Sequence, residues 1–222
     1  MRPFFLSSFF IAGLSLLGSN FLESKDKTST PKETLSLLLE GNQHFVTGKM
    51  AHLSYAEEAK NKLLENQTPL AAIVGCSDSR VPPELIFDRG LGELFVVRDA
   101  GNVIGPIEMD SVEFAVAKLH VPLVIVMGHQ NCGAVKAALS GPDEVPELDN
   151  ILPLIDKAIT TCNKDAKDKL REAIYCNVRE GVATLKKSPT IAPLIKQKKV
   201  DIIGAYFDFE SGQVLIVDLL QK

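Results

Sequence analysis

Short, almost continuous apolar runs recur along the chain, separated by stretches whose apolar residues follow a helical spacing. A continuous apolar run of this length is typical of a strand covered on both faces of a sheet. Strands are therefore predicted at residues 70–74, 93–97, 121–127, 200–207 and 214–217. Helices are predicted between them, at residues 106–119, 132–139, 147–161 and 165–186, with a short one opened by Ser188-Pro189. This alternation predicts an α/β fold with a mainly parallel β-sheet flanked by helices.

The two ends of this pattern differ from its middle. Glu210-Ser211-Gly212 is a turn short enough for an antiparallel hairpin at the sheet edge. At the other end, Thr30-Pro31-Lys32-Glu33 has the form of a helix start, and this helix should end near Gly41 or Gly48. A second helix is predicted around residues 55–65. Because these helices precede every strand, we expect them to pack on a partner subunit, with packing on their own sheet as the alternative.

The first two dozen residues have the character of a secretory signal. Arg2 gives a positive start, residues 4–17 are nearly all apolar, and Gly18-Ser19-Asn20 supplies small residues after them. The run is short for a membrane span, which needs about 20 residues, although an uncleaved anchor stays the alternative. We therefore expect a signal peptide at residues 1–24, cleaved near residues 18–24, and a periplasmic or secreted protein without a stable membrane span. Residues 28–222 then form a single domain.

Composition supports a globular body and argues against a nucleic-acid partner. The chain has 222 residues, of which 45% are hydrophobic and 23% charged, with a formal net charge of −4. Its densest basic cluster, formed by Lys196, Lys198 and Lys199, is typical of a solvated helix end. One sizeable core is expected.

Polar motifs follow two of the predicted strands. Cys76 follows the first strand, and His129 and Cys132 follow the third. In open α/β sheets, ligands bind beyond the carboxyl ends of the strands, so these side chains converge if the two strands are neighbours. Two thiolates and an imidazole are ligands that Zn²⁺ prefers, and three protein ligands leave a fourth position open. A buried thiol and a core histidine are the alternative for either residue taken singly.

Asp78 and Arg80 come close behind Cys76 in the chain. A carboxylate there could occupy the fourth metal position, whereas a bidentate arginine two residues further on would hold it off the metal. An ordinary structural ion pair is the alternative. We favour the functional interpretation, because the spacing places both residues beside the metal.

Taken together, Cys76-x-Asp78-x-Arg80 and His129-x-x-Cys132 resemble the paired signature of the β-class carbonic anhydrases, in particular an exported bacterial member. Residues 92–102, 201–206 and 211–214 also resemble segments of this family, and the resemblance extends over residues 35–218. It implies a zinc enzyme that hydrates CO₂ reversibly to bicarbonate and a proton, with one Zn²⁺ per subunit bound by Cys76, His129 and Cys132, and with metal-bound hydroxide as the nucleophile.

The resemblance also implies roles for further residues. Asp78 would accept a hydrogen bond from the hydroxide while Arg80 fixes Asp78. Gln67 would donate to substrate in the neighbouring subunit, and the Gly133 N–H would be a further donor. The apolar CO₂ pocket would be lined by Phe95, Ala100 and Phe114, although plain core packing explains these three equally well. A homodimer or a dimer of dimers follows.

One regulatory feature of some family members is not matched. Their bicarbonate site uses a tryptophan three residues before the first zinc cysteine, where this chain has Ile73, and the chain contains no tryptophan. Arg98 alone does not make such a site. An open metal site is therefore expected, and the proton relay stays undetermined among His44, His52 and His120.

Several alternatives remain. COS or CS₂ hydrolysis would use the same ligands, and a non-catalytic zinc module would use Asp78 as its fourth ligand. A thiol redox role for Cys76 and Cys132 is disfavoured, because the chain has no C-x-x-C motif. Cys162 and Cys176 lie close enough in sequence for a disulfide in an exported protein, but free buried thiols are the favoured interpretation.

Overall fold

A five-stranded sheet organises the part of the chain that the computed structural model describes, namely residues 29–51, 64, 66–141 and 145–217. The strands lie in the order β2-β1-β3-β4-β5. β1, β2, β3 and β4 run parallel to their neighbours, and β5 pairs antiparallel with β4. The predicted parallel sheet and its hairpin edge are thus confirmed. The strand bounds are Ala71–Cys76, Leu94–Asp99, Leu123–His129, Asp201–Phe207 and Val214–Ile216 for β1 to β5.

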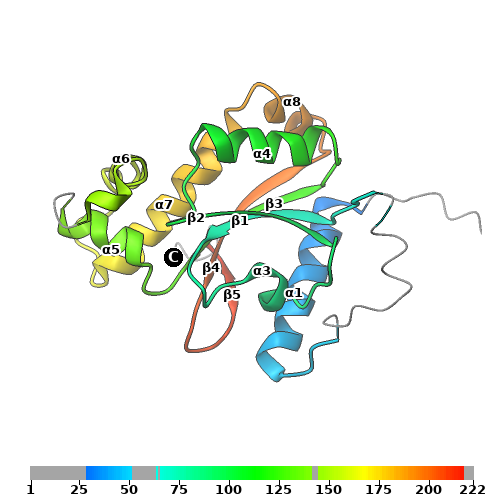
Figure 1. Ribbon diagram of the computed structural model, residues 1–222, viewed down its shortest axis with the longest axis horizontal. Coiled ribbons are helices and arrows are strands. Elements are labelled where there is room, and N and C mark those ends of the chain that lie inside the picture. Colours follow the sequence, from blue (N-terminus) through cyan, green and yellow to red (C-terminus); the bar gives the residue numbers. More distant parts are fainter. Residues whose placement is uncertain (1–28, 52–63, 65, 142–144, 218–222) are drawn as a thin grey trace, which may run out of the picture.

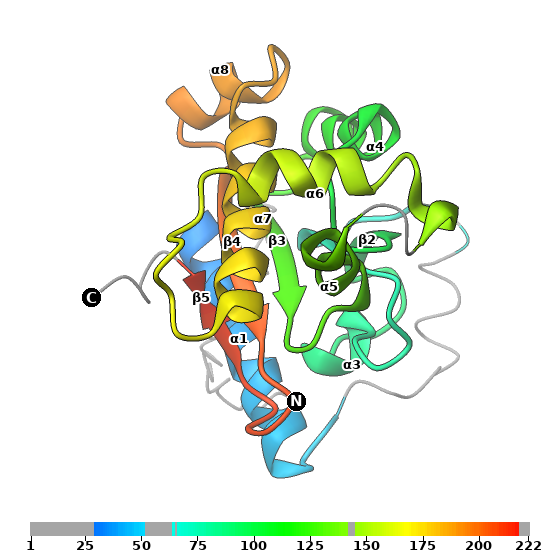
Figure 2. The same cartoon turned by 90° about the vertical axis from the view of Figure 1, so that its left-hand side faces the viewer.

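Helices cover both faces of this sheet. Figure 1 shows α4 and α8 above the sheet and α1 and α3 below it, and Figure 2 shows α7 running alongside β3 and β4. Their bounds are Pro31–Thr47 for α1, Pro83–Ile86 for α3, Pro106–Ala117 for α4, Gly133–Ser140 for α5, Leu152–Ile159 for α6, Lys169–Lys186 for α7 and Ile191–Lys196 for α8, with a 3₁₀ turn η2 at Pro146–Leu148.

The core lies around the neighbouring inner strands β1 and β3. Every residue of β1 and β3 is buried, as their continuous apolar sequences predict, whereas β2 at the edge is only partly buried. α7 packs closely on β3 and β4 at two glycines, Gly128 and Gly204. A Cβ on either one would stand less than 3.0 Å from the Val178 side chain, so only glycine leaves room for the helix. The sheet is thus fixed against α7 at the carboxyl half of β3.

α1 begins as predicted and ends at the second of the two expected glycines. Thr30 caps the helix, and its hydroxyl and backbone N–H form a reciprocal capping box with Glu33. Gly48 ends it in the left-handed conformation (φ 67°). Gly41 lies inside the helix, where the backbone carbonyl of Phe87 approaches so closely that a side chain would collide with it.

Some predicted helices were wrong in extent. The helix expected at residues 147–161 is split into η2 and α6, and the second piece begins beside Pro153, which favours a first helical turn. The helix expected at 165–186 starts at Lys169, because the Asp168 carboxylate accepts from Arg171 N and caps it. The four-residue α3 was not predicted. The helix expected at residues 55–65 lies outside the described residues, apart from Leu64.

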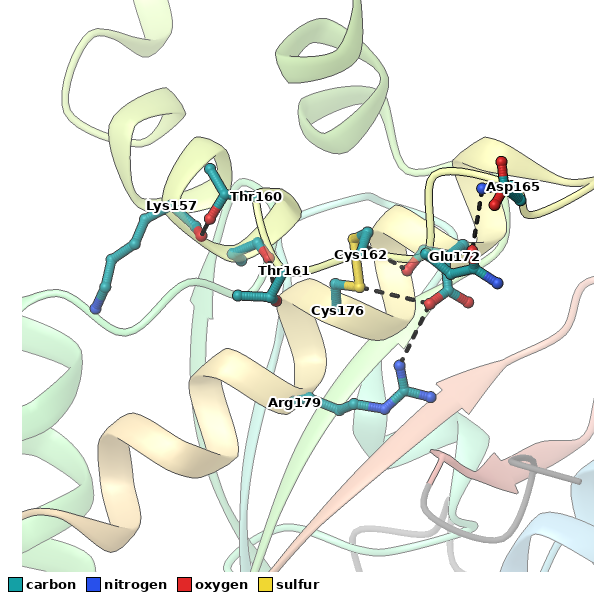
Figure 3. Close-up of a disulfide and its surroundings, with 10 residues drawn as sticks. Lys157, Thr160, Thr161, Cys162, Asp165, Glu172, Cys176 and Arg179 are labelled. Carbon is teal, nitrogen blue, oxygen red and sulfur yellow. Dashed lines mark hydrogen bonds and ion pairs between the residues drawn. A yellow bond between two sulfur atoms is a disulfide. The ribbon is translucent and has the colours of Figure 1, made fainter.

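Cys162 and Cys176 form a disulfide, which corrects the expectation of free thiols. Their Cα atoms are 5.8 Å apart, and the bond ties the segment after α6 to the first half of α7 (Figure 3). Sequence spacing alone did not decide the pairing, since it depends on how α6 folds back on α7. Within the described residues, no helix is long and apolar enough to cross a membrane. The apolar run at residues 4–17 lies outside them.

Candidate metal centre

Three buried side chains meet where β1 and β3 end. Cys76 is the last residue of β1, His129 is the last residue of β3, and Cys132 immediately precedes α5. Because β1 and β3 are parallel neighbours with Gly75 opposite Met127, their carboxyl ends fall at the same edge of the sheet. The ligand atoms of the three side chains all lie within 4.8 Å of one another.

The His129 ring is set for a ligand at Nε2. Its Nδ1 lies 2.9 Å from the carbonyl oxygen of Gln130, so Nδ1 carries the proton and donates it there. Nε2 then carries a lone pair. His129 is only 1% exposed, and its Nε2 has no hydrogen-bond partner. Burying a polar atom without a partner is costly, and a metal ion would satisfy this one. The site therefore fits a divalent metal with nitrogen and sulfur ligands.

The Cys76 sulfur lies among hydrogen-bond donors. The N–H groups of Asp78 and Gly101 point at Sγ from 3.4 and 3.3 Å. A hydrogen bond from the Cys132 thiol is the largest cause that lowers the pKa of Cys76, and the N–H groups of Gly101 and Asp78 lower it further against the effect of burial. The pKa of Cys132 is raised in turn by that bond and by burial. A cation placed between the two sulfurs would favour both as thiolates.

Asp78 lies beside the cluster and is held by Arg80. The guanidinium donates from Nε to Oδ1 at 2.9 Å and from Nη2 to Oδ2 at 2.7 Å. These hydrogen bonds hold the pKa of Asp78 well below its usual range. Asp78 Oδ2 is 3.9 Å from His129 Nε2, so the pinned carboxylate faces the region between the ligands.

Phe209 and Arg98 also support this arrangement, through contacts that the sequence did not predict. Phe209 lies under Arg80, with the guanidinium carbon 4.4 Å from the ring centroid, and its ring meets His129 edge to face. Arg98 donates to the carbonyl oxygens of Cys76 (2.9 Å) and Asp78 (2.7 Å), so it fixes the backbone of the loop after β1. An aromatic residue just past β4 was the only signal for Phe209, and such residues are common in cores.

The other predicted site residues fall into two groups. Ala100 and Gly133 lie next to the cluster: Ala100 precedes the Gly101 N–H donor, and a Cβ built on Gly133 would meet no atom within 4 Å. Gln67 is exposed and precedes the amino end of β1, so the length of the strand separates it from the cluster of its own chain.

Phe95 and Phe114 lie together but away from the three ligands. Their ring centroids are 6.3 Å apart, and Phe114 is 47% exposed. Phe95 pairs with Ala72, four positions before Cys76, which is roughly 13 Å along the sheet. Like Gln67, Phe95 therefore does not lie beside the three ligands of its own chain.

The candidate proton relays lie elsewhere. His44 Nδ1 contacts the buried carboxylate of Asp88 at 2.9 Å below the sheet. His120 precedes β3 and so lies at the opposite edge of the sheet from the cluster. His52 lies outside the described residues. Neither described histidine is placed beside the three ligands.

Comparison with known proteins identifies the class to which this fold and cluster belong. The family model described as "Carbonic anhydrase" (Pro_CA) matches residues 71–214, which include the whole cluster. The carbonic anhydrase of Mycolicibacterium smegmatis is 39% identical over 191 residues, covering 84% of this chain and 93% of that protein.

Solved structures specify the class further. The β-carbonic anhydrase CafA of Aspergillus fumigatus superposes with a TM-score of 0.65 at 28% identity, covering 74% of this chain and 83% of that one. A structure described as one of two tetrameric β-carbonic anhydrases from Sordaria macrospora gives a TM-score of 0.60 at 26% identity, covering 82% and 96%. The chain belongs to the β-carbonic anhydrase family, and its enzyme class is that of the lyases.

Proposed function

We propose that this protein hydrates CO₂ reversibly to bicarbonate and a proton, with one Zn²⁺ per subunit held by Cys76, His129 and Cys132. The observation that carries the proposal is the unpartnered, buried Nε2 of His129 among two thiols, with all ligand atoms within 4.8 Å. Zinc bound there would act as a Lewis acid and make hydroxide available from water near neutral pH.

The protein's own groups would then orient and receive the reactants. Asp78 stays ionised at physiological pH because Arg80 lowers its pKa, so it accepts a hydrogen bond from the attacking hydroxyl group but does not take up its proton. Both Asp78 oxygens already accept from Arg80. This hold supports an open fourth position and disfavours the alternative of a structural zinc module closed by Asp78.

Donors for the product oxygens come from two sources. The Gly133 N–H starts α5 beside Cys132, where open space leaves room for an oxyanion. Gln67 would donate from a neighbouring subunit, since it precedes the opposite end of β1 in its own. Phe95 and Phe114 would line the apolar CO₂ pocket in the same way, and Ala100 would line it from within the subunit. The active protein is therefore a homodimer or a dimer of dimers.

We also propose that the enzyme works outside the cytosol. Residues 1–24 would be removed as a signal peptide on export, leaving the single domain of residues 28–222. The Cys162–Cys176 disulfide supports this location, because such bonds persist in oxidising compartments and are rare in the cytosol.

Stopped-flow CO₂ hydration from pH 6.5 to 9 tests the proposal on zinc-loaded protein. Two thiolates donate more charge to the metal than imidazoles would, so turnover should rise through mildly alkaline pH. Asp78→Ala should lower turnover at every pH, because the orienting acceptor is gone. Asp110→Ala, on the exposed side of α4, is the matched carboxylate control and should behave like the unmodified protein.

The metal content of each sample makes the result decisive. Fast turnover that requires zinc and falls in Asp78→Ala alone would support the assignment. Fully bound zinc without turnover at any pH would refute CO₂ hydration. It would favour the alternative, COS or CS₂ hydrolysis at the same zinc site.

A further inference from the structure

We propose that Asn177 is a positioning residue for the Cys76 thiolate, acting through the backbone of Gly101. The inference rests on the proposed zinc site and adds a residue from α7 to the set that controls it. Asn177 lies 101 positions after Cys76 in the sequence, and its amide donates to Gly101, which is not one of the three ligands.

The first link joins α7 to the loop after β2. Asn177 is 3% exposed, and its Nδ2 donates to the carbonyl oxygen of Gly101 at 2.6 Å, inside the protein. The second link joins that loop to the metal ligand. The Gly101 N–H donates to Cys76 Sγ at 3.3 Å. One residue therefore faces the thiolate with its N–H and faces Asn177 with its carbonyl.

Gly101 needs an external anchor because its own conformation is weakly restrained. Its φ is +95°, a region in which a side chain is strained, and a Cβ would stand 3.0 to 3.1 Å from Ile155 and Ala134. Glycine is required there, but glycine also moves between backbone conformations at little cost. The Asn177 amide holds the carbonyl side of Gly101, and this fixes where its N–H points.

The anchor itself is held rigidly. The neighbouring residue Cys176 is bonded to Cys162, and Val178 packs against Gly128, the residue before the zinc ligand His129. Asn177 is thus fixed from both sides on α7, and small movements of the helix would be passed to the N–H···S contact.

An N–H···S hydrogen bond withdraws charge from a metal thiolate. Loss of the bond should raise the energy of the sulfur lone pairs, which changes the spectrum of a metal that reports it. It should also leave Cys76 less firmly oriented, so that this ligand leaves the metal more easily. Removing a hydrogen bond made to a metal ligand by a residue that does not itself bind the metal commonly lowers metal affinity by about 10- to 100-fold.

Cobalt-substituted protein provides the test. Asn177→Ala and Asn177→Asp should shift the thiolate-to-cobalt charge-transfer band to longer wavelength, and zinc should pass to a chelator at least about tenfold faster. Val182→Ala is the control, since this buried residue lies more than one turn later on the same helix and packs near Gly204 of β4. Its band and its zinc release rate should match those of the unmodified protein, even if its melting temperature falls.

The possible outcomes separate this inference from the zinc assignment. If the unmodified protein binds no metal at these residues, the zinc assignment fails and this inference with it. If it binds metal but both Asn177 variants behave like Val182→Ala, only the role of Asn177 is refuted. If neither variant folds, the unmodified protein loaded with ¹¹³Cd decides. The Gly101 amide proton should couple to the cadmium through sulfur and exchange slowly, and absence of both signals overturns the proposal.

Discussion

At the scale of single residues, the Asp78–Arg80 pair has the clearest geometry in the site. Arg80 uses two nitrogens on Asp78 and lies over the Phe209 ring. A lysine has neither the planar fork nor the stacking face, so it can replace the charge but not this geometry.

Arg80→Lys should therefore lower kcat/KM for CO₂ hydration by about tenfold while zinc stays bound. Stopped-flow assays with measured metal content check this. Arg171→Lys, an exposed substitution of the same type on α7, serves as the control. Unchanged turnover in Arg80→Lys would mean that the charge alone matters.

Asp99 is a second residue whose charge state depends on its surroundings. Its Oδ1 accepts from Val103 N, its Oδ2 has no partner, and burial raises its pKa to about 7. The unfolded value is about 3.9, so the folded metal-free protein holds this proton more tightly, and its stability falls as pH rises from about 4 to 7.

Asp99→Asn should remove this dependence. In metal-free protein, the unfolding free energy at pH 8 should rise by something on the order of 1 kcal/mol, with little change at pH 4. The metal is removed because a nearby cation would itself favour the carboxylate. Urea titrations at both pH values give the measurement, and an equal effect at both would contradict the role of ionisation.

At the scale of elements, the α1–α3 contact depends on Gly41. The Phe87 carbonyl occupies the space that a side chain would need, and the contact is backbone, which cannot move aside cheaply. Gly41→Ala should lower the unfolding free energy by about 1–3 kcal/mol, although alanine favours a helix. Glu40→Ala, on the exposed side of the same helix, is the control for helix propensity. Equal stability of both variants would contradict the close contact.

The disulfide between α6 and α7 offers a second test at this scale. It joins cysteines 14 positions apart, and loop entropy predicts a stabilisation of about 3 kcal/mol for a loop of this size. The double variant Cys162→Ser, Cys176→Ser should lose about that much while it keeps its zinc. Denaturant unfolding measures it. Mass spectrometry of the unmodified protein, isolated without reductant, checks the bond, and free thiols in that sample would contradict the predicted stabilisation.

Over the whole molecule, the sequence predicted what depends on local pattern. Continuous apolar runs located the buried strands, and the Thr30 capping box located the start of α1. The cluster followed from placing polar motifs at the ends of two strands. Contacts between distant segments were beyond such reasoning: nothing near Gly101 indicates Asn177, and nothing near Gly41 indicates Phe87. The four residues of α3 are too few to show a period.

If each active site takes Gln67 from one subunit and Asp78 from the other, two inactive variants should restore activity when they are combined in one dimer. Gln67→Ala and Asp78→Ala should each be nearly inactive with zinc bound. Mixed and reassembled one to one, they should recover about a quarter of the unmodified activity, because half of the dimers then carry one intact site. Activity of the mixture is compared with that of each variant treated alone. No recovery after verified exchange of subunits would place Gln67 outside the partner's site.

The position of the cluster in the strand order also bears on how the protein gains its stability. Cys76 and His129 come from the neighbouring inner strands β1 and β3, 53 residues apart in sequence, and β2 lies outside them at the edge. A bound metal would therefore link two inner strands of the sheet and would be lost when they separate on unfolding. Its binding free energy would be added to that of the native state, so the melting temperature should climb with free zinc concentration. For this chain, the supply of zinc would then determine how long a folded molecule lasts as well as whether it is active.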